Sequence, residues 1–250
     1  MTSLLAWVYE CSMKFLANLT RMLIPAPCFL CGANTTGESG LCASCLLGWV
    51  PVARAPRCPQ CATGVAMVGL LCAECAQAPP AFDCTHTGQD FNAATRHLVH
   101  QLKFARQPWV LPALLLPLVD QIERAYPAPR VDWPQALIPM PIHPQRRQAR
   151  GFNQARLIAD QLGRRFDLPV LGQAAVRVKA SAPQSGLDAA ARRKNLRDAF
   201  AVRQSLLAHV AIIDDVMTTG SSAAVLARVL KQAGVRRVTV WVLARTPRPD

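Results

Sequence analysis

The positions of apolar residues predict four helices and five short strands in the part of the chain after residue 80. Apolar residues recur every three or four positions, the spacing of one helix face, over residues 92–103, 111–126, 153–166 and 222–233. Apolar or alternating stretches of strand length cover residues 82–91 (a strand or hairpin), 137–142, 175–178, 210–213 and 237–244. Asn153 can cap the third helix, and Gly234 can end the fourth.

The order of these elements predicts an α/β fold. Strands and helices alternate, which favours a mainly parallel sheet with flanking helices. Ligands of such sheets bind beyond the carboxyl ends of the strands. The most informative strand end is the one that follows Ile213, because polar residues come directly after it.

The first 24 residues form a separate amphipathic pattern. Apolar residues step by three or four from Leu4 to Met22, which predicts a helix. Glu10, Lys14 and Arg21 interrupt the apolar run and no small-residue cleavage site follows, so a signal peptide is not expected. The most apolar stretch, residues 109–119, is shorter than a bilayer span, and we expect no transmembrane helix.

Composition and charge narrow the class of protein. Half of the 250 residues are apolar (51%) and 17% are charged, which excludes intrinsic disorder. The formal charge is +13, and from His143 onward 19 Lys and Arg face 7 Asp and Glu, a net charge of +12. We therefore expect the second half of the chain to meet an anionic partner, with phosphates as the obvious class.

Eight of the ten cysteines form two matched quartets that predict metal sites. Each quartet reads C-x2-C-x10-C-x2-C, and each cysteine of the second lies thirty residues after its counterpart. Two such pairs can close a tetrahedral zinc site, and the bound metal would supply folding energy to a segment too short to bury a core. The expected ligands of two structural Zn²⁺ ions are Cys28, Cys31, Cys42 and Cys45, then Cys58, Cys61, Cys72 and Cys75.

Two other interpretations of the cysteines stay open. A disulfide framework would need an oxidising compartment, which nothing else in the sequence supports. A redox Cys-x-x-Cys pair is the second alternative, and the even repetition of four pairs argues against it. Sequential pairing within each quartet is favoured over interleaving because it closes compact loops. The expected organisation is an amphipathic helix (1–24), a double four-cysteine zinc-ribbon segment (25–80) and an α/β domain (81–250).

The stretch from Val210 to Ser222 carries the main candidate site. An apolar strand leads into two acids and then into a turn of small hydroxyl residues around a glycine, directly before a helix. The backbone N–H groups, hydroxyls and helix dipole suit a phosphate, and solvent-facing carboxylates suit vicinal hydroxyls, so a ribose 5-phosphate fits both parts. The expected contact residues are Asp214, Asp215, Val216, Met217, Thr218, Thr219, Gly220, Ser221 and Ser222. The alternative is that the acids cap a helix or hold Mg²⁺.

This stretch resembles the phosphoribosyl-pyrophosphate (PRPP) loop of type I phosphoribosyltransferases, and the whole chain resembles the ComF family, including GntX-like proteins. The likeness also rests on the cysteine pairs, on His100–Phe104, on Arg147 with Arg150–Gln154, and on Arg192–Leu196 before Ala199-Phe200. It implies a type I phosphoribosyltransferase-like fold. It further implies links with natural competence, handling of single-stranded DNA and use of DNA as a nutrient.

The resemblance also implies the chemistry and the remaining site residues. PRPP would bind with Mg²⁺, and a nucleophile would displace pyrophosphate, although the sequence indicates neither the acceptor nor a catalytic acid or base. Guanidinium groups that fork onto two oxygens suit the pyrophosphate, and the candidates are Arg146, Arg147, Arg150 and Arg192. A solvated basic loop is the alternative. Lys103 could reach a phosphate, but a lysine extended along a helix end is commoner.

A binding protein without catalysis is the second hypothesis for function. The basic half would favour single-stranded nucleic acid, because phosphate contacts dominate that affinity. Aromatic residues for base stacking are scarce, at 6% of the chain. Single-stranded DNA and a DNA-uptake helicase or processing protein are therefore possible partners beside PRPP, in a cytoplasmic protein.

Overall fold

The computed structural model describes residues 26–49, 55–104, 107–130, 132–143, 151–178, 199–204 and 207–247. The N-terminal part contains a short antiparallel pair and two small helices, β1 (Ala26–Pro27), β2 (Asn34–Thr35), α2 (Ala43–Trp49) and α3 (Ala73–Gln77). The amphipathic helix expected over residues 1–24 lies outside the described residues.

The rest of the described chain alternates strands and helices. Its elements are β3 (Cys84–Asp90), α4 (Ala93–Phe104), the 3-10 turn η2 (Pro108–Val110), α5 (Leu111–Ala125), β4 (Ala136–Pro139), α7 (Gln154–Phe166), β5 (Ala175–Arg177), β6 (Phe200–Val202), β7 (His209–Met217), α9 (Ser221–Gln232) and β8 (Arg237–Arg245). None of the helices in the described ranges is long and apolar enough to cross a bilayer.

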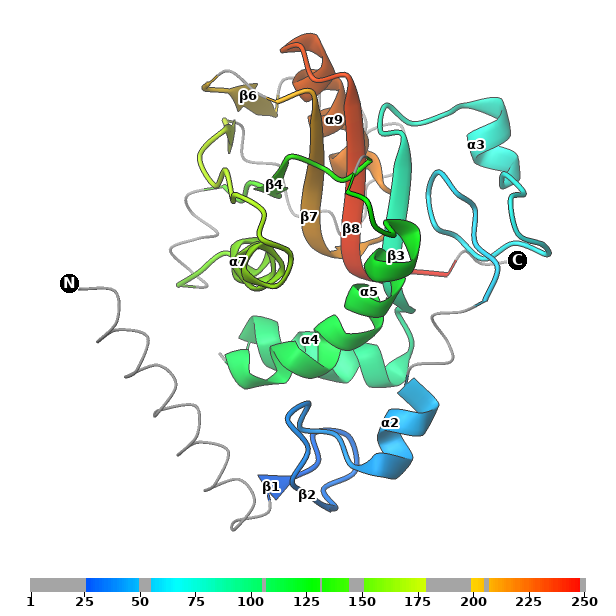
Figure 1. The fold of residues 1–250 in the computed structure, drawn as a ribbon, viewed down its shortest axis with the longest axis vertical. Helices are drawn as coiled ribbons and strands as arrows, with labels where there is room; N and C mark the ends of the chain where they lie inside the picture. The colour runs from blue at the N-terminus through cyan, green and yellow to red at the C-terminus, as the bar shows by residue number, and fades with distance from the viewer. Residues whose placement is uncertain are drawn as a thin grey trace, which may run out of the picture.

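Four parallel strands form the central sheet in the order β3-β8-β7-β4. Successive residues of a strand point to opposite faces, and β7 shows this clearly. Val210 and Ile212 pack with α9 and the β5–β6 hairpin on one face, whereas Ala211 and Ile213 pack with α4, α5 and α7 on the other. Figure 1 shows the sheet between these layers. The expected α/β class with a parallel sheet is confirmed.

Local signals agree with most of the observed elements. The Asn153 side chain accepts a hydrogen bond from the backbone N–H of Ala155 at 3.1 Å and so caps α7, as expected. Gly234 follows α9 with a φ of +98°, a conformation that favours glycine. The predictions for α4, α5 and β8 hold within one or two residues.

Two strands differ most from their predictions, and β4 also ends at Pro139, three residues before its predicted end. β7 does not end at Ile213 but continues through both aspartates to Met217, because β8 pairs with it along this whole length. β6 was not expected, and it pairs antiparallel with β5 in a separate two-stranded sheet. In both cases the partner strand, rather than the local apolar pattern, sets the length.

Candidate functional site

The two cysteine quartets gather into two separate clusters. Within each quartet the four sulfur atoms all lie within 4.8 Å of one another. The Sγ atoms of Cys31 and Cys42 are 3.6 Å apart, as are those of Cys61 and Cys72, far beyond a disulfide bond. A tetrahedral ion with Zn–S bonds of 2.3 Å holds sulfurs about 3.8 Å apart. The geometry therefore fits two structural zinc sites with sequential pairing.

The raised pKa values of two clustered thiols are consistent with cysteine clusters that bind a cation. A hydrogen bond with Cys31, together with burial, raises the pKa of Cys45 to about 12. Burial and the neighbouring thiols raise the pKa of Cys75 well above its usual range. Bound Zn²⁺ would stabilise the thiolates and so reverse both shifts.

The two clusters lie at different places on the α/β domain. In Figure 1 the first, in blue, lies below α4, and the second, in cyan, lies beside β3. The first is joined to α5 by Trp49, whose indole N–H donates to the carbonyl of Ala113 at 2.9 Å. Three cysteines of the second cluster are buried in the same core as α9. The two cysteine clusters therefore have different structural environments, although their sequences repeat the same spacing.

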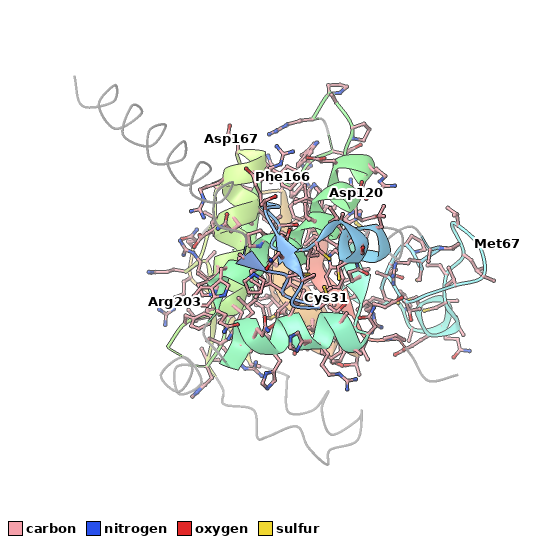
Figure 2. All side chains as sticks on the ribbon, turned by 90° about the horizontal axis from the view of Figure 1, so that it is seen from below. Cys31, Met67, Asp120, Phe166, Asp167 and Arg203 are labelled. Carbon is pink, nitrogen blue, oxygen red and sulfur yellow. The ribbon has the colours of Figure 1, made fainter. Side chains whose placement is uncertain are left out.

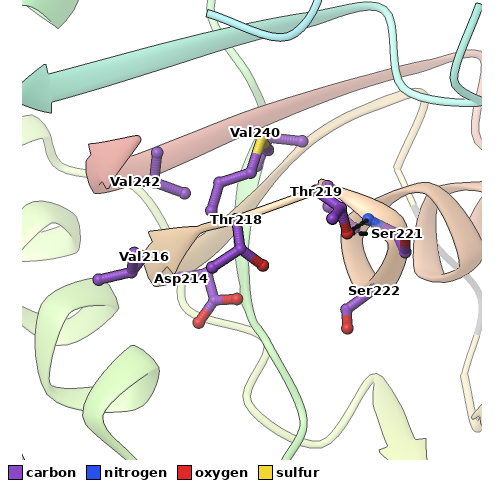
Figure 3. Close-up of a pocket in the computed structure, with 11 residues that line it drawn as sticks. Asp214, Val216, Thr218, Thr219, Ser221, Ser222, Val240 and Val242 are labelled. Atoms are coloured by element: carbon purple, nitrogen blue, oxygen red, sulfur yellow. Dashed lines mark hydrogen bonds between the residues drawn. The ribbon is translucent and has the colours of Figure 1, made fainter. Parts of the chain in front are cut away.

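A pocket opens where β7 ends and α9 begins. It has about 490 Å³ of open space, a volume that includes its mouth. Its lining consists of Asp214, Val216, Met217, Thr218, Thr219, Gly220, Ser221, Ser222 and Ala223, with Val240 and Val242 from β8. Figure 3 shows the carboxylate and hydroxyl groups around it, with the two valines on the β8 side.

The geometry of the turn over residues 218–222 suits an anion. Gly220 has a φ of +77°, a left-handed conformation that favours glycine and turns the chain from β7 into α9. The hydroxyls of Thr219 and Ser221 are 2.8 Å apart, and the N–H of Ser221 donates to Thr219 Oγ1 at 3.3 Å. The first N–H groups of a helix have no partner within it and lie at its positive end. This turn can therefore bind a phosphate.

The two aspartates face different partners. Asp214 lines the pocket, whereas Asp215 forms an ion pair with Lys103 of α4, Nζ to Oδ2 at 2.8 Å. Adjacent strand residues point to opposite faces, which explains the separation. The expectation of two solvent-facing acids is wrong for Asp215, which is only 9% exposed. Burial and the charge of Asp215 raise the pKa of Asp214 to about 7, although Lys103 and Arg177 oppose the shift.

Relatives of known name match nearly the whole chain. A double zinc ribbon domain matches residues 19–93. The DNA utilization protein YhgH of Salmonella typhimurium is 33% identical over 90% of this chain and 99% of its own length. Competence protein F of Haemophilus influenzae is 32% identical over 87% of this chain and 96% of its own. The chain belongs to the ComF/YhgH family.

Four of the expected site residues of this ComF/YhgH protein lie outside the described residues. They are the arginines assigned to pyrophosphate, Arg146, Arg147, Arg150 and Arg192. The described chain ends at His143 before the first three and begins again at Gly151, next to the N-terminus of α7. Their role as anion ligands stays a prediction.

Sequence reasoning missed three groups near the pocket. Lys103 was assigned to solvent or to a phosphate, but it pairs with Asp215. Arg177 of β5 lies close enough to lower the pKa of Asp214. Val240 and Val242 were predicted to lie in a strand, but the sequence did not indicate that they line the pocket. No local pattern could have identified them, because each reaches the site from another element of the fold.

Proposed function

We propose that this protein binds PRPP with Mg²⁺ at the end of β7 and acts as a phosphoribosyltransferase-like protein. The observation that supports this most is the pocket itself, in which one carboxylate and a hydroxyl-rich turn at a helix N-terminus line the same space. A ribose 5-phosphate offers hydroxyls to the first and an anion to the second. Neither group alone would select this ligand.

Each part of the ligand would have its own partners. The 218–222 turn would bind the 5-phosphate, and Asp214 would accept hydrogen bonds from ribose hydroxyls. Mg²⁺ bound with PRPP would supply positive charge to the leaving pyrophosphate, and the four arginines named above would neutralise it further. Displacement at C1 then needs an acceptor, which the site residues do not specify.

The biological context that we propose is the handling of DNA. The relatives carry the names DNA utilization protein and Competence protein F. A reducing compartment such as the cytoplasm would keep eight thiols available for zinc. A nucleobase released from DNA is therefore the class of acceptor to test first.

Calorimetric titration of the full chain tests the proposal. Ribose 5-phosphate, pyrophosphate and PRPP would be titrated separately, with and without Mg²⁺. Losing a hydrogen bond to a charged group costs about 1.5–3 kcal/mol, so Asp214→Asn should weaken PRPP binding roughly 10–150-fold. Thr219→Val should weaken ribose 5-phosphate and PRPP equally, because both carry the 5-phosphate. Thr36→Val, an exposed threonine of the first ribbon, is the matched control.

Two results would refute the proposal. One is the absence of PRPP binding by zinc-loaded wild-type protein. The other is binding that both pocket variants leave unchanged, which would move the site elsewhere.

The charge of the second half favours a second candidate function, the binding of single-stranded nucleic acid. The observation is the net charge of +12 from His143 onward. Affinity should then fall with salt with a log–log slope of about −0.7 for each phosphate contacted. Replacing Arg146 and Arg147 together, or Arg150 and Arg192 together, by uncharged residues should reduce the magnitude of that slope. Binding of DNA by a protein that ignores PRPP would favour this candidate over the first.

A further inference from the structure

Four consecutive backbone carbonyls of the second cysteine cluster accept hydrogen bonds, three of them from residues of the central sheet. The carbonyl of Pro59 accepts from the N–H of Thr85 at 3.3 Å, and that of Gln60 accepts from the Thr85 hydroxyl at 2.7 Å. The carbonyl of Cys61 accepts from Arg245 Nε at 2.9 Å. That of Ala62 accepts from Arg57 Nη1 at 3.2 Å. The loop that carries the first two ligands of this cluster, residues 58–62, thus has each of its carbonyls from Pro59 to Ala62 hydrogen-bonded.

Arg245 connects this loop to the anion-binding turn. It is the last residue of β8 and is 1% exposed. While its Nε bonds to Cys61, its Nη1 donates to the carbonyls of Met217, at 3.3 Å, and of Thr218. The same nitrogen donates to the carbonyl of Thr246 at 2.8 Å. One buried guanidinium therefore holds both a zinc-ligand peptide and the first peptides of the 218–222 turn.

Apolar packing joins the same two regions. Cys58, Cys61 and Cys75 belong to the core that contains Met217 and Phe82. A Cβ placed on Gly220 would lie 3.5 Å from Met217 Sδ and 3.6 Å from Phe82 Cζ. The turn and the second cluster thus border the same apolar core.

The first cluster has no such connection. The bonds within its loop, from the N–H of Cys28 to the carbonyl of Ala33 and from that of Gly32 to the carbonyl of Cys28, have counterparts at Cys58 and Ala62 of the second cluster. The two loops therefore differ in the bonds that leave them. The first cluster is joined to α5 through Trp49. Within the described ranges, no hydrogen bond joins residues 26–49 to residues 217–222.

We propose that Arg245 is a positioning residue through which the second zinc site, but not the first, sets the shape of the 218–222 turn. Loss of the ion would let the 58–62 loop move away from Arg245 Nε. A buried guanidinium that loses an acceptor must find another, and it would release the carbonyl of Thr218, whereas that of Met217 would keep its bond from the N–H of Thr246. The statement about anion binding rests on the proposed function, whereas the statement about the turn does not.

Amide hydrogen exchange of the full chain without ligand tests the link. The thirty-residue repeat supplies a matched pair, because Cys72→Ser and Cys42→Ser remove the corresponding ligand from each cluster. Each variant should retain one zinc ion per chain. We expect exchange in residues 218–224 to become at least tenfold faster in Cys72→Ser and to stay within twofold of wild type in Cys42→Ser. Equal exchange at the turn in the two variants would overturn the proposal.

A second pair of variants separates positioning from zinc binding and from general loss of stability. Arg245→Lys keeps the charge but cannot reach carbonyls on both sides, whereas Arg57→Lys alters the other arginine anchor of the loop. Both should keep two zinc ions. Only Arg245→Lys should speed exchange at the turn and weaken the binding of inorganic phosphate about tenfold, with exchange in the middle of β7 unchanged. Unchanged exchange at the turn in Arg245→Lys would refute the positioning role.

The two proposals fail in different ways. If wild-type protein binds neither phosphate nor PRPP but the exchange results hold, the proposed function fails and the structural link stands. If PRPP binds and exchange at the turn is insensitive to Cys72 and Arg245, the link fails alone.

Discussion

Two adjacent residues of β7 show how differently one fold can treat the same side chain. Asp215 pairs with Lys103 at 2.8 Å, whereas Asp214 lies in the pocket without a cation in salt-bridge contact among the described residues. The pKa of Asp214 rises to about 7 because burial and the charge of Asp215 both disfavour its ionised form. The ligand-facing carboxyl is thus close to half-protonated at neutral pH.

This shift predicts that ligand binding depends on pH. A carboxylate accepts hydrogen bonds from ribose hydroxyls and binds Mg²⁺, whereas a carboxylic acid does so poorly. Affinity for ribose 5-phosphate with Mg²⁺ should therefore rise about tenfold between pH 6 and pH 8, measured by calorimetry. The Asp214→Asn protein should lose the part of this pH dependence that comes from the carboxyl group and keep only the part that comes from ionisation of the ligand's phosphate. Parallel pH profiles for the two proteins would show that Asp214 is not the titrating group.

The ion pair of Lys103 predicts a stability effect that a double variant reverses. The two side chains are 20% and 12% exposed. Removing one partner of a buried pair costs about 3–5 kcal/mol, so Lys103→Met should lower the free energy of unfolding by about 2–3 kcal/mol at this partial exposure. Adding Asp215→Leu should restore most of the loss, because no unpaired charge remains. Denaturant unfolding measures both, and a double variant no more stable than Lys103→Met would contradict this account.

At the scale of elements, the turn between β7 and α9 depends on one glycine. Gly220 and Gly234 both have positive φ values, +77° and +98°, at the two ends of α9. Gly220→Ala and Gly234→Ala should each lower stability by about 1–2 kcal/mol, since a left-handed conformation strains an L-residue. Neither added Cβ meets an atom closer than 3.5 Å.

Only the first of these glycine variants should affect the ligand. Gly220→Ala changes the turn that lines the pocket and should weaken ribose 5-phosphate at least fivefold, whereas Gly234→Ala should leave the affinity unchanged. Thermal unfolding and calorimetry on the same samples measure both effects. Equal loss of affinity in the two variants would indicate that stability, not the shape of the turn, controls binding.

At the scale of the whole molecule, two histidines at the amino ends of the sheet strands predict sensitivity to acid. Burial, with the nearby charge of Arg237, lowers the pKa of His86 on β3 and of His209 on β7 to about 4. In the unfolded chain the two histidines bind protons near pH 6.5. The contribution of the neutral, buried histidines to the free energy of unfolding is therefore complete above pH 6.5 and is lost as the pH falls toward 4. We expect the free energy of unfolding to fall by roughly 1–2 kcal/mol per histidine between pH 6.5 and pH 4.

Replacing His86 separates this effect from general acid unfolding. His86→Gln keeps a group that can bond to the Tyr126 hydroxyl, which lies 3.2 Å from His86 Nε2. Denaturant unfolding at pH 7.5, 6 and 5 should then show a smaller loss of stability than in wild type. An identical slope in both proteins would assign the acid sensitivity to other groups.

Several features of this protein follow from its sequence alone. The apolar period predicts α4 and α7, because one face of each is buried, and the run of mostly apolar residues predicts β8, which is buried on both faces. The spacing of the cysteines predicts two sequential clusters, because each closes within a short loop. The order of strand, acids, turn and helix similarly predicts the pocket at the end of β7. All three depend on residues that are close in sequence.

Other features were decided only by the tertiary structure. β7 continues through two charged residues because β8 pairs with them. Asp215 differs from Asp214 because Lys103, far away in the sequence, forms its ion pair with Asp215. Two identical cysteine spacings acquire different surroundings because Arg245, at the opposite end of the chain, contacts only the second. Such contacts depend on which elements the folded core brings together, and the local pattern of residues carries no signal for that.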